Sequence, residues 1–450
     1  MNQSTAENRI KVLSQQIEPS NEERLHQLTI NSTLGSKDKQ MSGVFGEIEV
    51  APRDPILGLN AAFKEDKSPK KVNLGVGAYR TEDGKPLVLP VVRKVEQKML
   101  DLGFDKEYIP QSGLPEFQKV SPLLLFGKDS PAIKENRLAC LQTLSGTGAL
   151  RVGCEFVQKF LPKGTTVYVP NPTWGNHYSV IESAGLKAGK YRYLNKDTMK
   201  VDIDGLLEDV NNAPDHSVIL LHVCAHNPTG VDPTKDDWKK IAEVIKKKNH
   251  LTFFDSAYQG FASGDLDKDA FSVRLFVDQG LELMAAQSYA KNFGLYGERI
   301  GAISFVCKDA KKAEAILSQV NRIIRAMYSS PPLHGARIVA LTLGDDSLLS
   351  EWKKDLEGMA NRIIEMRTAL LEGLQKKKTP SPTKDGTWKH VVEQIGMFSF
   401  TGLDNAQVKR LIDEHHIYLT SDGRISMAGI NPSNVEYIVN AIDEVVRHKY

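Results

Sequence analysis

The chain has 450 residues, of which 41% are hydrophobic and 25% charged, a composition typical of a soluble globular protein with more than one domain. Its 58 basic side chains nearly balance its 56 acidic ones, so neither a nucleic-acid partner nor a membrane surface is expected. The 4 cysteines stand far apart without a C-x-x-C pair, which argues against a metal site or a disulfide framework and favours a reducing compartment.

Residues 1–43 are polar and carry charges of both signs, which predicts a mobile N-terminal extension. No apolar stretch follows Met1, so a secretion signal is not expected, and acidic residues such as Glu7 and Glu18 argue against a mitochondrial presequence. The cytoplasm is therefore the expected compartment, with the mitochondrion as the alternative that the extension leaves open.

The chain turns apolar from Val44 onward, where Pro52 and Pro55 predict an extended segment rather than the interior of a helix. The stretch "KVNLGVGAYR" predicts a strand and a glycine-rich turn. The stretch "PVVRKVEQKML" predicts a helix with Pro90 near its start.

The middle of the chain alternates between apolar strands and helices. The short runs "TTVYVP", "SVILLHV", "LTFFDSAY" and "LELMAAQSYA" are rich in Val, Ile, Leu and Phe, and helical patterns such as "DDWKKIAEVIKKKN" separate them. This alternation predicts an α/β domain with a mostly parallel sheet that is buried on both faces. Ligands should then gather at the carboxyl ends of the strands.

The tail of the chain mixes amphipathic helix patterns with short strand patterns such as "GMFSFTG". This mixture predicts a smaller α+β domain. We assign residues 86–358 to the large domain, and residues 53–85 together with 359–450 to the smaller one.

Polar residues follow several predicted strands. In "TLSGTGALRVG", Ser145, Gly146 and Thr147 stand just before a helical run, where backbone N–H groups can stabilise an anion. In "LLHVCAHNPTGVDP", His226 and Asn227 precede Pro228, which holds Asn227 extended and directs its amide. An ordinary helix start and an ordinary Asn-Pro turn are the structural alternatives.

Asp255 directly follows the apolar run "LTFF", where a buried carboxylate would need a positive partner, and Tyr258 lies one helical turn further on. A helix N-cap aspartate is the alternative. In "QSYAKNFGLYGERIG", Lys291 in a site of low polarity would be a nucleophilic amine, while Arg299 and Ser288 offer phosphate ligands. An aldehyde-reactive amine, a phosphate cup and an acid together point to pyridoxal 5′-phosphate as cofactor.

Seven ordered motifs resemble the signatures of the aspartate aminotransferases, which are pyridoxal-phosphate enzymes of fold type I: "LGVGAYR", "LSGTGAL", "NPTWGNH", "HNPTG", "DSAYQGF", "SYAKNFGLYGERIG" and "GMFSFTGL". The resemblance runs from about Val44 to the C-terminus. It implies a large α/β domain whose mixed, mostly parallel sheet is sandwiched by helices, plus a smaller α+β domain.

The resemblance also implies a role for each matching residue. Lys291 would form the Schiff base with the cofactor and then shuttle a proton, and Asp255, backed by His177, would pair with the pyridinium nitrogen. The remaining cofactor contacts would come from Asn227 and Tyr258 at the phenolic oxygen, Trp174 stacked on the ring, and Ser145, Gly146, Thr147, Ser288 and Arg299 at the phosphate. Tyr108 would reach that phosphate from a neighbouring subunit, which implies a homodimer, with residues 44–52 as an arm toward the partner.

For the substrate, the resemblance assigns the α-carboxylate to Arg424 and the distal carboxylate to Arg325 from across the interface, with Gly77, Trp174 and Asn227 alongside. It predicts transfer of the amino group from L-aspartate to 2-oxoglutarate, giving oxaloacetate and L-glutamate in a ping-pong reaction. The alternatives are an aromatic-amino-acid aminotransferase of the same family and a catalytically silent binding protein with this fold.

Overall fold

The computed structural model describes residues 44–46, 48–51 and 55–448. The whole of the expected N-terminal extension, residues 1–43, therefore lies outside the described residues, as does part of the expected arm. The chain divides into a unit that ends at Arg53 and a unit from Asp54 to Tyr450. In the first unit the described residues form a turn, in which the Ile48 N–H donates a hydrogen bond to the carbonyl oxygen of Phe45 (3.1 Å).

The second unit begins with a helix where the sequence predicts an extended segment. Helix α3 spans Pro55–Glu65 and starts at the proline itself. This corrects the expectation, because proline lacks an N–H that the first turn of a helix does not use. Strand β1 (Val72–Asn73) follows, and helix α4 (Pro90–Asp101) starts at Pro90 as predicted.

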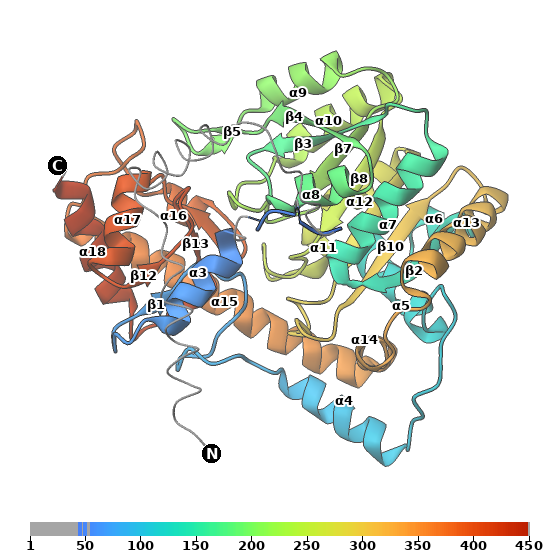
Figure 1. Ribbon diagram of the computed structural model, residues 1–450, viewed down its shortest axis with the longest axis horizontal. Coiled ribbons are helices and arrows are strands. Elements are labelled where there is room, and N and C mark those ends of the chain that lie inside the picture. The colour runs from blue at the N-terminus through green and yellow to red at the C-terminus, as the bar shows by residue number, and fades with distance from the viewer. Residues whose placement is uncertain (1–43, 47, 52–54, 449–450) are drawn as a thin grey trace, which may run out of the picture. The chain divides into compact units, whose positions relative to one another are not determined.

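A seven-stranded sheet forms the centre of the large domain, with the order β2-β10-β9-β8-β7-β3-β4 (Figure 1). Its strands are β2 (Leu138–Leu144), β3 (Thr166–Asn171), β4 (Lys187–Arg192), β7 (Val218–His222), β8 (Leu251–Ser256), β9 (Leu283–Ser288) and β10 (Ile300–Val306). Neighbours from β4 to β9 pair in parallel, whereas β10 is antiparallel to both β2 and β9. This confirms the predicted α/β class with a mostly parallel sheet.

Apolar side chains alternate between the two faces of this sheet, and each face has its own core. Helices α7 (Ser145–Phe160), α8 (Asn176–Ser183) and α13 (Ala310–Tyr328) contribute to the core on one face. The core on the other face includes residues of α5 (Pro115–Phe126), α6 (Pro131–Lys134), α9 (Ile203–Asn212), α10 (Lys235–Lys247), α11 (Leu266–Asp269) and α12 (Phe271–Asp278). A sheet covered on both faces explains why its strands read as continuous apolar runs.

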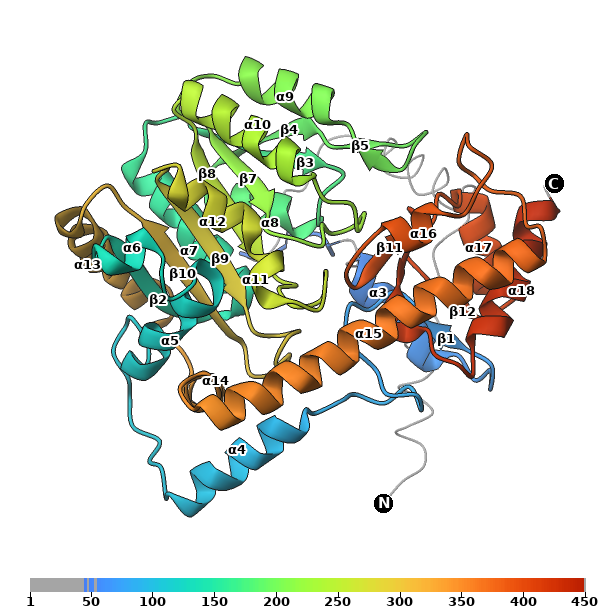
Figure 2. The same ribbon diagram turned by 180° about the vertical axis from the view of Figure 1, so that it is seen from behind.

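Helix α15 (Asp346–Lys376) connects the large domain with the C-terminal lobe (Figure 2). It packs on α4 and α14 (His334–Leu343) toward one end and on α16 (His390–Glu393) and α18 (Val435–Arg447) toward the other. The proposed domain boundary after residue 358 falls inside this helix. The C-terminal lobe also contains β11 (Phe398–Phe400), α17 (Asn405–Asp413), β12 (Ile417–Tyr418), β13 (Arg424–Ser426) and the 3₁₀ turn η1 (Met427–Gly429).

Two small sheets hold this lobe together. Strand β1 pairs in parallel with β12, which brings Val72 beside Ile417 and supports the proposed grouping of residues 53–85 with the C-terminal part of the chain. Strands β11 and β13 pair antiparallel, with Phe400 opposite Arg424. A separate hairpin joins β5 (Leu194–Asn195) to β6 (Lys200–Val201).

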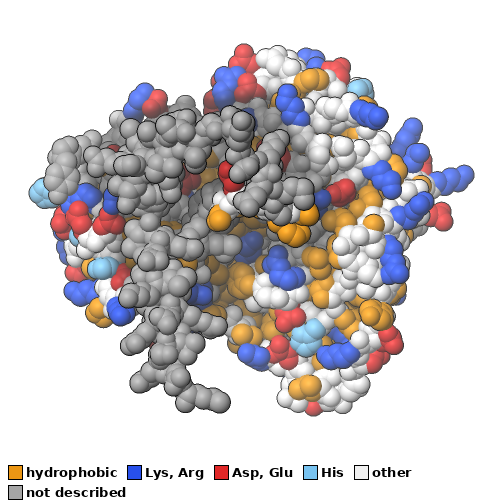
Figure 3. Space-filling model, in the orientation of Figure 1, with side chains coloured by type: hydrophobic (Ala, Val, Ile, Leu, Met, Phe, Trp, Pro, Cys, Tyr) orange, Lys and Arg blue, Asp and Glu red, His pale blue; other side chains and the backbone are white. Residues whose placement is uncertain are grey.

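The surface agrees with the balanced charge of the sequence. On the face drawn in Figure 3, basic and acidic side chains of the described residues are interspersed rather than gathered in one large patch. None of the helices described is both long and apolar enough to cross a membrane.

Candidate active site

The glycine-rich segment opens helix α7 directly after β2. Ser145 adopts a left-handed backbone conformation (φ 61°), and its N–H donates to the carbonyl oxygen of Arg299 (3.0 Å). The hydroxyls of Ser145 and Ser288 lie 3.1 Å apart, and a Cβ added to Gly146 would come within 3.0 Å of the Ser288 Cβ. The unsatisfied N–H groups of the first turn of α7, with these hydroxyls, therefore form a cup whose chemistry suits a phosphate.

Strand register brings the next groups to the same edge of the sheet. His222, the last residue of β7, is paired with Asp255 of β8, and Asp255 is paired with Ala286 of β9. Because these strands are parallel, their carboxyl ends meet at one edge, next to Ser288 at the end of β9.

Asp255 is a buried carboxylate with a histidine behind it. Its Oδ2 lies 3.1 Å from Nε2 of His177, whose Nδ1 lies 2.8 Å from the hydroxyl oxygen of Thr173. Burial acts to raise the pKa of Asp255, but the hydrogen bond with His177 and the nearby positive charges outweigh it, so the pKa lies below its usual value. The site therefore holds a negative charge at neutral pH.

Lys291 supplies the amine of the site. Its Nζ lies 4.9 Å from the centroid of the Tyr258 ring. Burial lowers the pKa of Lys291, partly opposed by the charge of Asp255, which increases the fraction of neutral, nucleophilic amine. Burial also raises the pKa of Tyr258, so its hydroxyl remains a hydrogen-bond donor at neutral pH.

Arg424 enters the site from the C-terminal lobe. One of its terminal nitrogens donates to the carbonyl oxygen of Gly75 (2.6 Å) and the other to Oδ1 of Asn227 (3.4 Å). The guanidinium lies 4.3 Å from the centroid of the Phe398 ring, and its Nε is buried without a hydrogen-bond partner. Within the described residues, no carboxylate forms an ion pair with Arg424, so this buried cation is free to bind a substrate carboxylate in a forked geometry.

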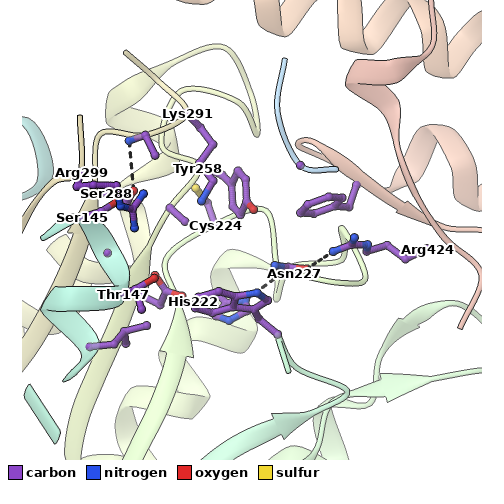
Figure 4. A pocket seen from close by; sticks show the side chains of 18 residues that line it. Ser145, Thr147, His222, Cys224, Asn227, Tyr258, Ser288, Lys291, Arg299 and Arg424 are labelled. Carbon is purple, nitrogen blue, oxygen red and sulfur yellow. Dashed lines mark hydrogen bonds between the residues drawn. The ribbon is translucent and has the colours of Figure 1, made fainter. Parts of the chain in front are cut away.

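These side chains surround a cavity of about 280 Å³ (Figure 4). In that view Ser145, Ser288 and Arg299 lie at one end and Arg424 at the other. Of the residues predicted from the sequence, the cavity is lined by Gly77, Ser145, Gly146, Thr147, Trp174, Asn227, Asp255, Tyr258, Ser288, Lys291, Arg299 and Arg424. His177 stands one layer behind, against Asp255.

Besides His177, two predicted residues lie outside this cavity. Tyr108 is 88% exposed and lines a different pocket, which it shares with Arg299. Arg325 is exposed on α13, where it donates to the hydroxyl of Ser329. The resemblance assigns both residues to the site of a partner chain, and those assignments stay predictions.

The cavity also contains residues that the sequence analysis did not select, namely Leu150, His222, Cys224, Ala257, Ala290 and Phe398. His222 was detectable, since a polar residue ending the apolar strand "VILLH" carries the same signal as Asp255. Its Nδ1 accepts a hydrogen bond from the Asn227 N–H (3.1 Å), and burial lowers the pKa of His222 to about 3, so its ring is neutral. Phe398 lies in the quoted motif "GMFSFTGL", but its apolar side chain gives no sign of a place in the site.

The residues present fit pyridoxal 5′-phosphate. A cup of N–H and hydroxyl groups, kept open by the missing Cβ of Gly146, matches the phosphate, and an amine with a lowered pKa matches the aldehyde. The anionic Asp255 matches a protonated ring nitrogen.

Comparison with known proteins identifies the class to which this site belongs. The family model for class I and II aminotransferases matches residues 69–442, and the chain belongs to that family. Aminotransferases of this class depend on pyridoxal phosphate.

Within the family, the similarity is to aspartate aminotransferases. The chain is 54% identical over 406 residues to the cytoplasmic aspartate aminotransferase of Oryza sativa subsp. japonica, covering 90% of this chain and 98% of that protein. It is 51% identical over 445 residues to the chloroplastic aspartate aminotransferase 3 of Arabidopsis thaliana, covering 98% and 97%. The solved structure of the cytoplasmic aspartate aminotransferase of Saccharomyces cerevisiae superposes with a TM-score of 0.87 at 44% identity, covering 90% of this chain and 98% of that one.

Proposed function

We propose that this chain is an L-aspartate:2-oxoglutarate aminotransferase that uses pyridoxal 5′-phosphate and produces oxaloacetate and L-glutamate in a ping-pong reaction. The observation that carries the proposal is one cavity lined by Lys291, the anionic Asp255, the phosphate cup and Arg424, with which no carboxylate of the described residues forms an ion pair. When bound, the cofactor supplies a ring that withdraws electrons from the substrate α-carbon.

The chain's own residues position the reactants and move the proton. The cup at 145–147, Ser288 and Arg299 would bind the phosphate, and Asp255 would keep the ring nitrogen protonated. The Tyr258 hydroxyl and the Asn227 amide would donate hydrogen bonds to the phenolic oxygen. Arg424 binds the substrate α-carboxylate, which brings the α-carbon within reach of the Lys291 amine for proton transfer.

The test is the absorbance spectrum of the purified protein before and after L-aspartate, and again after 2-oxoglutarate. We expect a visible cofactor band that is lost with aspartate and returns with the keto acid, because the amino group is held on the enzyme between the half-reactions. A band that L-aspartate leaves unchanged but L-phenylalanine removes would support the aromatic-amino-acid alternative instead. A colourless protein that borohydride leaves unmodified would contradict the use of pyridoxal phosphate.

The active form in this proposal is a homodimer with shared sites. Tyr108 and Arg325 match family site residues, and both lie outside the cavity of their own chain, which is consistent with a contribution to a partner's cavity. Mixing chains that carry Lys291→Ala with chains that carry Arg325→Asp should restore activity toward aspartate, since one of the two mixed sites would be intact. Mixed chains as inactive as the separate variants would contradict shared sites.

Arg325→Asp is expected to reverse the charge preference for the substrate side chain. An aspartate at this position would repel the distal carboxylate and attract a cationic side chain, so kcat/KM for L-aspartate should fall by about 100-fold or more while L-lysine or L-arginine becomes a substrate. The measurement is kcat/KM for each amino acid, with the exposed Arg322→Asp on the same helix as the control. An unchanged preference for L-aspartate would contradict the contact.

We place the protein in the cytoplasm within this proposal. The acidic residues among 1–43 argue against a mitochondrial presequence, and the 4 buried, unpaired cysteines fit a reducing compartment. Microscopy of a fluorescent protein fused behind residues 1–43 tests it, and confinement of the fluorescence to an organelle would overturn it.

A further inference from the structure

Arg367 is a buried cation without an acidic partner. It lies on α15 and is only 3% exposed, and its terminal nitrogens donate to the carbonyl oxygens of Val391 (2.7 Å), Gly396 (2.9 Å) and Phe398 (2.5 Å). Across the described residues, no carboxylate forms an ion pair with it. A guanidinium buried against neutral carbonyls alone is costly, so its position requires an explanation beyond packing.

The carbonyls that Arg367 binds belong to both ends of one segment, residues 391–398. The side chain of Gln394 in this segment accepts hydrogen bonds from the Phe400 N–H (2.9 Å) and the Ser399 hydroxyl (2.6 Å), which joins the segment to β11. Arg367 therefore connects the 391–398 segment to helix α15, while Gln394 connects it to strand β11.

The same segment packs tightly against the turn that carries Asn227. The Ile395 N–H donates to the carbonyl oxygen of Gly230 (2.7 Å). A Cβ on Gly230 would lie 2.5 Å from the Phe398 carbonyl oxygen, and one on Gly396 would lie 2.3 Å from the Ala225 Cβ. The contact between the 391–398 segment and residues 225–230 thus leaves no room for a side chain. A shift of the 391–398 segment would therefore displace residues 225–230 as well.

Phe398, at the end of this segment, lies under the substrate-binding arginine. Its ring centroid is 4.3 Å from the Arg424 guanidinium and 5.6 Å from the Tyr258 ring, and a Cβ on Gly77 would lie 2.6 Å from its Cζ. The polar contacts of Arg424 are to neutral oxygens, and its Nε has none. The Phe398 ring therefore acts together with these two hydrogen bonds in setting the plane of the Arg424 guanidinium.

We propose that Arg367 is a positioning residue for carboxylate recognition, which fixes the 391–398 segment so that Phe398 orients Arg424. The inference rests on the proposed function, in which Arg424 binds the substrate α-carboxylate. Arg367 acts only through Phe398, since it is not among the described residues that line the cavity. Its loss should weaken the binding of every carboxylate substrate and leave the cofactor end of the site intact.

The test compares Arg367→Met, which keeps the side-chain length but removes the donors, with the exposed Lys354→Met on the same helix. We expect KM for L-aspartate and for 2-oxoglutarate, and Kd for the unreactive dicarboxylate succinate, to rise between about 10- and 100-fold. The kcat should stay within about threefold, because saturating substrate still meets Lys291 and Asp255 in place. The cofactor spectrum should match that of the wild type.

A purely structural role would give a different result. Lower stability in urea with unchanged KM and Kd would overturn the inference. Should Arg367→Met not fold, Arg367→Lys keeps the charge and one donor group, and its KM should lie above that of Lys354→Met; an equal KM would overturn the inference as well.

A double-mutant cycle tests the route through Phe398. Phe398→Leu combined with Arg367→Met should raise KM no further than the more severe single variant does. Both changes disturb the contact between the Phe398 ring and the Arg424 guanidinium, the first directly and the second through the 391–398 segment. Additive effects would overturn the coupling. Failure of the wild type itself to exchange amino groups with L-aspartate would contradict the proposed function, which distinguishes the two failures.

Discussion

Replacing Lys291 by alanine is expected to abolish transamination, lowering kcat by at least about 10⁴-fold. Lys291 is the sole lysine among the described residues that line the cavity, so no neighbouring amine can take over proton transfer at the substrate α-carbon. The lowered pKa of its amine suits it to both nucleophilic attack and proton transfer near neutral pH. The phosphate cup is untouched by the change, so the variant should still bind the cofactor, without a covalent bond.

The measurement is kcat with L-aspartate and 2-oxoglutarate, followed by borohydride reduction and mass spectrometry of peptides. The wild type should carry the reduced cofactor on Lys291, and the variant should carry none. Lys246→Ala, which removes an exposed lysine from α10, is the matched control and should behave as the wild type. Turnover by Lys291→Ala within about tenfold of the wild type would contradict its role.

Asp255→Asn is expected to lower kcat by about 10³-fold, because a neutral amide of the same shape cannot keep the ring nitrogen of the cofactor protonated. The contact with His177 can persist in the variant, so the effect isolates the charge from the geometry. In the wild type the pKa of Asp255 is lowered, which means that the carboxylate gains a proton only in acid. Activity should therefore not decline through this group until the pH falls below the range in which an ordinary aspartate side chain titrates.

The pH dependence of kcat is measured for the wild type, for Asp255→Asn and for the exposed Asp236→Asn, which should match the wild type. The visible band of the bound cofactor provides a second measurement, since it should shift when the ring nitrogen loses its proton. An Asp255→Asn variant with wild-type kcat and an unchanged spectrum would show that this charge does not act on the cofactor.

Local patterns in the sequence were sufficient to predict the class of fold and many of the residues that line the cavity. Continuous apolar runs report strands buried on both faces, and polar residues at their ends, such as Asp255 and Ser288, meet because parallel strands end at one edge. The lysine motif around Lys291 and the glycine-rich start of α7 are contiguous in the chain, so the chemistry they offer is readable without a structure. The residues at 55–65 were misread, because a proline is compatible with both an extended segment and a first helical turn.

The tertiary structure decided how distant segments meet. Strand pairing between β11 and β13, and between β1 and β12, brings Arg424, Phe398 and the Gly75 carbonyl together, although no local pattern links them. The neutral state of His222 follows from its burial, and the carbonyl partners of Arg367 follow from the packing of α15 on residues 391–398; neither can be read from neighbours in the chain. The sequence by itself determined the periodicity of the elements and the functional groups at strand ends, whereas long-range packing determined which side chains orient those groups, since such contacts carry no periodic signature.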